Sequence, residues 1–217
     1  MIKIFTIHYK KLIDRKENII NQLEKYNLQT EFIDRYDRDL LLDKNLSIFN
    51  LSQLNKANIA ISLSHFYAYN NIANNVNLYN YALILEDDVV LSDNFLDKLN
   101  NYILQLPDDW DMCFIGDGCG LHIENHKLLP NQNIYKKCLI PTNWGGNGAT
   151  RCTDSYIVNK KCAVQICKYI ENLKTKINLP IDWWLNVVCR DNNFNVYWAE
   201  PTIITQGTQN GLYKSSH

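Results

Sequence analysis

The chain has 217 residues, which is enough to bury one core, and we expect a single domain over residues 1–217. Its formal net charge is −1, so the charge balance does not favour nucleic-acid binding. No apolar run is long enough to span a membrane, the first residues lack the apolar core of a signal peptide, and the seven cysteines include no C-x-x-C pair. These features predict a soluble protein with reduced thiols, in the cytoplasm or elsewhere inside a cell.

Strands and helices are expected to alternate along most of the chain. Apolar runs predict strands, and apolar residues at a period near 3.6 predict helices. In chain order we expect a strand over 2–8, a helix over 10–26, a strand over 31–34, a helix over 53–74, a strand over 81–85, a helix over 95–104, strands over 111–115 and 155–158, helices over 160–172 and 181–188, and a strand over 194–198. Residues 35–50 and 116–150 are expected to be loops. The alternation indicates an α/β sandwich with a mostly parallel central sheet.

The most informative stretch is residues 81–90, where an apolar run ends on Glu86, Asp87 and Asp88. Three carboxylates at the end of a buried strand repel one another, and a cation usually offsets such repulsion. Hard oxygen ligands suit Mg²⁺ or Mn²⁺, which can also bridge the phosphates of a nucleotide. Because ligands of open α/β sheets bind at the carboxyl ends of strands, the triplet predicts a metal and phosphate site. A phosphohydrolase, a nuclease or a solvated acidic turn would also fit the triplet alone.

Several motifs follow one another in the order of a known family. Residues 83–89, Leu-Ile-Leu-Glu-Asp-Asp-Val, resemble the acidic motif of the family 25 glycosyltransferases, which include lipooligosaccharide and collagen galactosyltransferases. Five further segments resemble motifs of that family. They are 7–15, which ends on Arg15; 58–65, which ends on Ser64 and His65; 153–163; 180–185, Pro-Ile-Asp-Trp-Trp-Leu; and Pro201 with Gln206. The chain departs from the family at Asn58 and Ile61, where the usual motif has Glu and Cys.

The resemblance implies a GT-A fold, a UDP-sugar donor (UDP-galactose or UDP-glucose favoured), inversion at the anomeric carbon, and a divalent cofactor, Mn²⁺ or Mg²⁺. Asp88 is expected to bind the metal directly, while Glu86 and Asp87 hold water, ribose hydroxyls or the outer shell of the ion. The residues implied to bind the nucleotide-sugar are Ile7, His8, Arg15, Ser64, His65 and Asp87. Arg15 could instead form a surface ion pair on its own helix.

Inverting transfer also needs a base that takes the proton of the acceptor hydroxyl. We expect Asp182 in this role, because it follows Pro180 at the first turn of a helix, where backbone N–H groups favour an ionised carboxyl. Trp183 and Trp184 beside it could offer an apolar face to an acceptor sugar. Alternatively, Asp182 is only a helix cap and both tryptophans belong to the core, and Asp154 is then the next candidate base.

Other features leave alternatives open. His65 lies on an apolar helix and is expected to be a structural residue near the donor site. The segment 144–148, Trp-Gly-Gly-Asn-Gly, either borders a pocket or is a surface turn, because it lacks the context of a P-loop. For the whole chain, a non-catalytic module that binds sugar-nucleotides or glycans, or a metal-dependent phosphohydrolase, competes with a transferase that acts on a glycan or protein acceptor. The sequence predicts neither the sugar, the acceptor nor the oligomeric state.

Overall fold

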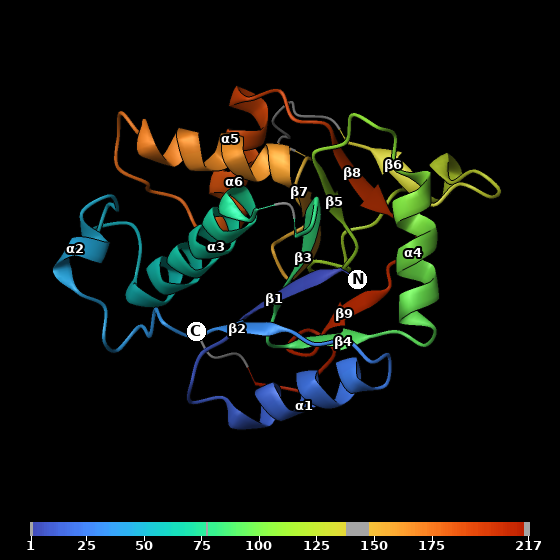
Figure 1. Ribbon diagram of the computed structural model, residues 1–217, viewed down its shortest axis with the longest axis horizontal. Helices are drawn as coiled ribbons and strands as arrows, with labels where there is room; N and C mark the ends of the chain where they lie inside the picture. Colours follow the sequence, from blue (N-terminus) through green and yellow to red (C-terminus); the bar gives the residue numbers. More distant parts are fainter. Residues whose placement is uncertain (1, 77, 138–147, 215–217) are drawn as a thin grey trace.

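A seven-stranded sheet runs through the centre of the molecule (Figure 1). The computed structural model describes residues 2–76, 78–137 and 148–214. The strands of the central sheet are β1 (Lys3–Ile7), β2 (Glu31–Ile33), β3 (Tyr81–Glu86), β5 (Met112–Phe114), β6 (Ile134–Lys136), β7 (Ser155–Asn159) and β8 (Val196–Ala199). Their order is β2-β1-β3-β7-β5-β8-β6, and a separate ribbon pairs β4 (Val89–Leu91) with β9 (Ile204–Gln206).

Most strands of the central sheet share one direction. β1 is parallel to β2 and β3, and β5 is parallel to β8. β7 lies antiparallel between β3 and β5, and β6 lies antiparallel to β8, so β1, β2, β3, β5 and β8 all point the same way. The predicted α/β fold with a mostly parallel sheet is therefore confirmed. The strand β6 and the reversed direction of β7 were not predicted.

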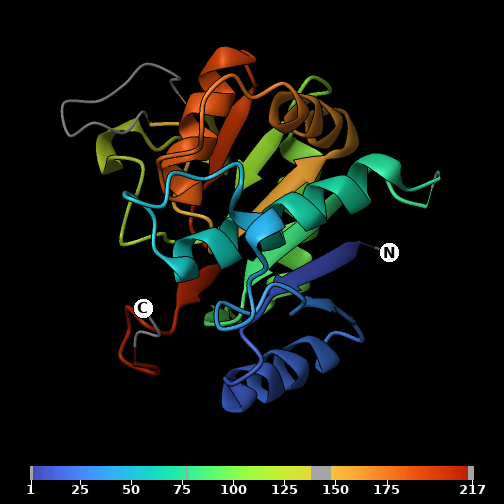
Figure 2. The same ribbon diagram turned by 90° about the vertical axis from the view of Figure 1, so that its left-hand side faces the viewer.

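Helices cover both faces of the sheet (Figures 1 and 2). One face carries α3 (Lys56–Asn74), α5 (Lys160–Glu171) and α6 (Ile181–Asp191), and the other carries α1 (Ile13–Glu24) and α4 (Phe95–Gln105). Successive residues of β3 alternate between the two cores, with Ala82 and Ile84 in the first and Leu83 and Leu85 in the second. This alternation follows from the pleat of a strand, and it explains why a strand buried on both sides is a continuous apolar run.

Short elements appear within the two segments that were expected to be loops. α2 (Asp43–Leu46) lies in the first, and η1 (Asn125–Lys127) and β6 lie in the second. The strands β4 and β9 were not predicted either. Each of these elements has only three or four residues, too few for a periodic pattern to emerge. Among the helices of the described residues, none is long and apolar enough to cross a membrane.

Distant parts of the chain meet at the carboxyl ends of β1 and β3. The register places Ile7 beside Glu86, so the chain leaves both strands at the same edge of the sheet. The residues before β7 arrive at this edge from the opposite direction, and the Glu86 N–H donates to the Asp154 carbonyl oxygen at 2.7 Å. The β4–β9 ribbon places Gln206 opposite Val89. Segments from both halves of the chain therefore surround the acidic triplet.

Candidate functional site

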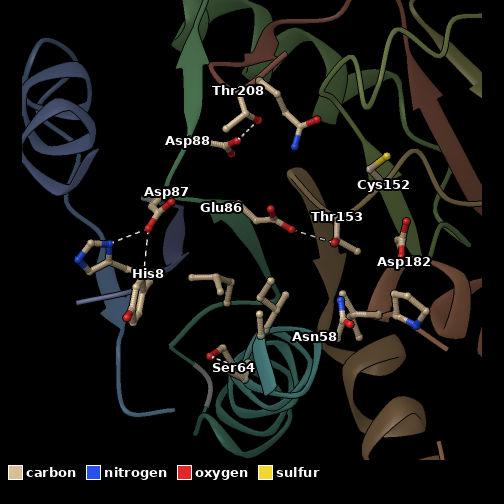
Figure 3. Close-up of a pocket in the computed structure, with 18 of the residues that line it drawn as sticks. His8, Asn58, Ser64, Glu86, Asp87, Asp88, Cys152, Thr153, Asp182 and Thr208 are labelled. Carbon is tan, nitrogen blue, oxygen red and sulfur yellow. Dashed lines mark hydrogen bonds and ion pairs between the residues drawn. The ribbon is translucent and has the colours of Figure 1, made fainter. Parts of the chain in front are cut away.

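A pocket of about 330 Å³ lies at this edge of the sheet (Figure 3). Its walls come from the ends of β1 and β3, the N-terminal half of α3, the first turn of α6 and the segment that follows β9. The residues from the sequence predictions that line it are Ile7, His8, Arg15, Ser64, Glu86, Asp87, Asp88 and Asp182. The pocket therefore brings together most of the predicted site, and the three carboxylates of the triplet take different roles in it.

Asp87 has both carboxylate oxygens occupied by donors of the chain itself. Its Oδ2 accepts from His8 Nδ1 at 2.8 Å and from the Tyr9 N–H at 3.2 Å, and its Oδ1 accepts from Arg15 Nη1 at 3.0 Å. Arg15 also donates through Nη2 to the Lys214 carbonyl oxygen at 2.7 Å. Arg15 thus pairs with the triplet and not with a neighbour on its own helix. These contacts tie the acidic turn to the end of β1 and to the C-terminal segment.

Asp88 differs because one of its oxygens has no partner. Oδ2 accepts from the Thr208 hydroxyl at 2.5 Å, while Oδ1 is buried without a hydrogen bond (Figure 3). The residue is only 5% exposed. Burial and, next in size, the negative charge of Glu86 raise the pKa of Asp88 to about 6. A carboxylate that is buried, repelled and half-satisfied is one that a bound cation would stabilise.

Glu86 lines the pocket and is anchored by the hydroxyl of Thr153, which donates to Oε1 at 2.9 Å. His65 Nε2 lies 3.8 Å from the same oxygen. The His65 side chain is fully buried, with Nδ1 2.8 Å from the Tyr156 hydroxyl and its ring stacked on the Tyr156 ring. His65 therefore lies behind the pocket wall, next to Glu86. This placement supports a structural role, whereas Ser64 lines the pocket itself and donates to the Ala60 carbonyl oxygen.

Asp182 lies in the first turn of α6 and lines the pocket. Burial raises the pKa of Asp182 above that of an ordinary carboxyl. A hydrogen bond from the Trp183 N–H opposes this rise, and the charge of Glu86 adds to it.

The two tryptophans next to Asp182 differ in their exposure to solvent. Trp184 is 5% exposed and packs on Phe66 at a ring-centroid distance of 5.0 Å, whereas Trp183 is 42% exposed. Trp184 is a core residue, and neither tryptophan belongs to the described lining of the pocket.

Asp154, the other candidate base, is fully buried next to Glu86. Ser155 Oγ donates to its Oδ2 at 2.8 Å, and burial raises its pKa well above the usual range. Gly116 approaches so closely that a Cβ at that position would stand 2.0 Å from the same Oδ2. Asp154 is enclosed and does not line the pocket in the described structure, whereas Asp182 does, so Asp182 is the better placed of the two candidate bases.

The residues of the pocket fit a divalent cation that is held by few protein ligands. Carboxylate and amide oxygens are preferred ligands of Mg²⁺ and Mn²⁺. Two such oxygens, Asp88 Oδ1 and Gln206 Oε1, are buried without a partner on residues that line the pocket with Glu86. Within the described ranges, no three His, Cys, Asp or Glu side chains form a group that could hold a metal by themselves. An ion here would therefore also need oxygens of a ligand or of water.

Several residues of the pocket were not predicted as site residues. They are Thr153, Gln206, Thr208 and the two cysteines Cys119 and Cys152. The cysteine Sγ atoms lie 3.6 Å apart, and all six cysteines of the described residues are free thiols. Thr153 and Gln206 lie in segments that resemble family motifs, but no site role was predicted for them. No local pattern marks Thr208, Cys119 or Cys152, because their neighbours in the pocket come from other parts of the chain. The predicted glycine-rich feature falls mainly on residues 144–147, which lie outside the described residues.

The two departures from the family pattern also line the pocket. Asn58 exchanges hydrogen bonds with Asn55, which places a capping box at the start of α3 where the family has Glu. Ile61 follows on the next turn and adds an apolar side chain to the wall where the family has Cys. Both replacements leave the carboxylates of the triplet and Asp182 in place.

Fold and site together define an α/β protein whose pocket lies where parallel strands end, with carboxylates suited to a cation. Residues 1–185 match the family described as glycosyltransferase family 25 (LPS biosynthesis protein), and the chain belongs to that family. A putative glycosyltransferase of Acanthamoeba polyphaga mimivirus, R655, is 29% identical over 141 residues, which are 62% of this chain and 42% of that relative. The match spans less than half of the viral protein. The family predicted from the sequence is confirmed by the match over residues 1–185.

Two solved structures resemble parts of the fold at low identity. One is a mutant of Drosophila β-1,4-galactosyltransferase 7 in complex with manganese, UDP-Gal and xylobiose, with 13% identity and a TM-score of 0.43 over 96% of this chain and 69% of that one. The other is the galactosyltransferase LgtC in complex with donor and acceptor sugar analogues, with 10% identity and a TM-score of 0.46 over 94% of this chain and 86% of that one.

Proposed function

We propose that this protein is a metal-dependent, inverting glycosyltransferase that moves a hexose from a UDP-sugar to a hydroxyl of a glycan or protein acceptor, with UDP-galactose or UDP-glucose as favoured donors. Family membership supports the class of reaction. The observation that carries the proposal is the chemistry of one pocket, which is lined both by Asp88 with its unpartnered oxygen and by the desolvated carboxyl of Asp182.

Asp88 and Glu86 would hold Mn²⁺ or Mg²⁺ in this pocket. When bound, the ion would offset the negative charge that develops on the diphosphate as the sugar leaves. Asp88 is the direct ligand in this proposal, because its Oδ1 has no other partner, while Oε1 of Glu86 already accepts from Thr153. Asp87 is engaged with His8 and Arg15, so it would shape the site without binding the ion.

The nucleotide would lie against the end of β1 and the start of α3. Ile7 and Ser64 line this wall, and His8 and Arg15 supply donors beside the diphosphate. Their hydrogen bonds to Asp87 hold both side chains in fixed positions before a ligand arrives, which reduces the entropy lost on binding. The choice of uracil as the base rests on the family alone.

Asp182 would act as the general base from the α6 side of the pocket. Its carboxylate would take the proton of the acceptor hydroxyl while the hydroxyl oxygen attacks the anomeric carbon from the face opposite the diphosphate. Because burial raises the pKa of Asp182, its carboxylate is a stronger base than that of an exposed aspartate. After transfer, the proton would pass from Asp182 to water.

A panel of UDP-, GDP- and CMP-sugars, incubated with Mn²⁺ and glycan or peptide acceptors, tests the proposal. We expect UDP release that depends on an acceptor, stops in excess chelator, and returns when Mn²⁺ is added back. Asp88→Asn should lose most of this activity at an unchanged melting temperature, because the residue lies at a strand end. Full activity of the wild type in excess chelator would remove the metal from the proposal.

The same panel separates the competing functions. A non-catalytic module would bind a sugar-nucleotide but release no UDP with any acceptor. A phosphohydrolase would release phosphate or nucleotide equally with and without an acceptor. The replacements at Asn58 and Ile61 are the observation that favours the first competitor, whereas the retained Asp88 and Asp182 favour the transferase.

A further inference from the structure

The turn after β9 is joined to Asp88 by two hydrogen bonds. The Gly207 N–H donates to the Asp88 carbonyl oxygen at 2.6 Å, and the Thr208 hydroxyl donates to Asp88 Oδ2 at 2.5 Å. Gly207 is required for this approach, since a Cβ there would stand 2.8 Å from the Asp88 carbonyl oxygen. This turn lies beyond residues 1–185, the part of the chain that matches the family. The family match therefore assigns no role to Gly207 or Thr208, and the resemblance of Gln206 to a family motif carries no metal-binding role for it.

Two unpartnered oxygens belong to this junction. Among the described residues, three buried side-chain oxygens lack a hydrogen bond: Asp88 Oδ1, Asp154 Oδ1 and Gln206 Oε1. Asp88 and Gln206 both line the pocket, and pairing of β4 with β9 places Gln206 opposite Val89, next to Asp88. A buried acceptor without a partner is costly, so two of them in one pocket point to a ligand that both could share. A carboxylate and an amide oxygen together suit a hard divalent cation.

Thr208 explains why only one oxygen of Asp88 is available. Its hydroxyl donates to Oδ2, which fixes the rotation of the carboxylate and leaves Oδ1 free (Figure 3). Hydrogen bonds of this kind, from a neighbour to a metal-binding side chain, orient the ligand and raise metal affinity. The hydroxyl, and not the shape of the side chain, is the group that matters in this argument.

We propose that Gln206 is a second protein ligand of the divalent cation bound by Asp88, and that Thr208 is the positioning residue that orients Asp88 toward it. This inference rests on the proposed metal-dependent function. It adds a neutral oxygen ligand from the C-terminal ribbon to the acidic motif of β3. The cation site is then built from two parts of the chain, which are joined only when β4 pairs with β9.

Direct titration of the full chain with Mn²⁺, in the presence of UDP, tests the proposal. The probe is the electron paramagnetic resonance signal of free Mn²⁺, which falls as the ion binds. Thr208→Val keeps the shape of the side chain and removes the hydroxyl, and Gln206→Leu removes the amide oxygen. We expect each change to weaken Mn²⁺ binding about 10- to 100-fold. Thr208→Ser and Gln206→Glu keep an oxygen at each position, and both should bind Mn²⁺ at least nearly as tightly as the wild type.

Thr205→Val is the matched control, because Thr205 lies on the same strand and outside the described lining of the pocket. It should leave the Mn²⁺ titration unchanged, and melting temperatures of all variants check that folding is intact. If the wild type binds Mn²⁺ while Thr208→Val and Gln206→Leu bind it equally well, this inference is wrong and the proposed function stands. If Thr208→Ser and Gln206→Glu weaken binding as much as the other two variants, the oxygens are not the cause and the inference fails. If the wild type itself binds no Mn²⁺ with UDP, both the inference and the metal dependence fail.

Discussion

Asp182→Asn offers the sharpest test of the proposed chemistry. Asparagine keeps the shape of the side chain and an oxygen that can accept from the Trp183 N–H, but it cannot take a proton. Loss of a general base typically slows a reaction by about 10²- to 10⁴-fold. At 1.36 kcal/mol for each factor of ten, this corresponds to a rise of about 3–5 kcal/mol in the activation barrier. Initial rates of UDP release at saturating donor measure it directly.

The raised pKa of Asp182 adds an expectation about pH. The base works only when ionised, so the transfer rate of the wild type should fall as the pH drops through the raised pKa, above the range of an exposed aspartate. The contribution of Asp182 to the free energy of unfolding has the opposite pH dependence, because it falls as the pH rises. The folded state holds the Asp182 proton more tightly than the unfolded state does, so this residue lowers stability as the pH rises from the unfolded pKa to the folded pKa. Asp182→Asn should therefore melt at the same temperature as the wild type at pH 7, or higher.

Asp111→Asn is the matched control for this substitution. Asp111 is also buried with a raised pKa, and its Oδ2 accepts from the Asn195 N–H at 2.9 Å, but it does not line the pocket in the described structure. The control should keep the wild-type rate. If Asp182→Asn transfers sugar at nearly the wild-type rate, Asp182 is only a helix cap. If it abolishes UDP binding, the residue lies on the donor side of the reacting carbon.

Three further predictions concern stability and the donor. Arg151 is fully buried and forms an ion pair with Glu200. Arg151→Met leaves Glu200 without this partner, so it should lower the unfolding free energy by about 3–5 kcal/mol and Tm by roughly 6–20 °C. Calorimetry measures the shift, and an unchanged Tm would contradict the prediction. Trp184→Ala should cost about 3–5 kcal/mol in denaturant unfolding, while Trp183→Ala should stay within about 0.5 kcal/mol, and equal effects would show that we have misplaced the core. Calorimetry with Mn²⁺ should find UDP bound more tightly than GDP or CMP, and tighter binding of GDP would refute the choice of base.

The sequence predicted the fold where apolar patterns were long. The strands at 81–85 and 155–158 and the helices at 53–74 and 160–172 agree with β3, β7, α3 and α5 to within a few residues. The direction of β7 could not be predicted, because the connection from β5 to β7 is long enough to reach either end of the sheet. The pairing of β4 with β9 was also beyond reach, since it joins two three-residue strands more than a hundred positions apart.

The outcome at the two tryptophans shows what the sequence did contain. In α6 the buried residues Ile181, Trp184, Leu185 and Val188 follow the spacing i, i+3, i+4 and i+7 of an apolar helix face. Trp184 belongs to that face and Trp183 does not, so the spacing alone is enough to identify Trp184 as the core residue of the two. For Thr208 no such signal existed, because its partner Asp88 is 120 positions away.

The acidic triplet is stable because three different parts of the fold engage its three side chains. Glu86 accepts from Thr153, Asp87 pairs with Arg15 and His8, and Asp88 accepts from Thr208. Of the three, only Asp87 has an arginine partner among the described residues. Burial raises the pKa of Asp88 most, and the uncompensated charge of Glu86 adds to the rise. A divalent cation would reduce this repulsion between the two carboxylates. In the proposed function, the cation and the diphosphate would bind together, so the positive ion would offset both the charge of the triplet and the charge of the phosphates.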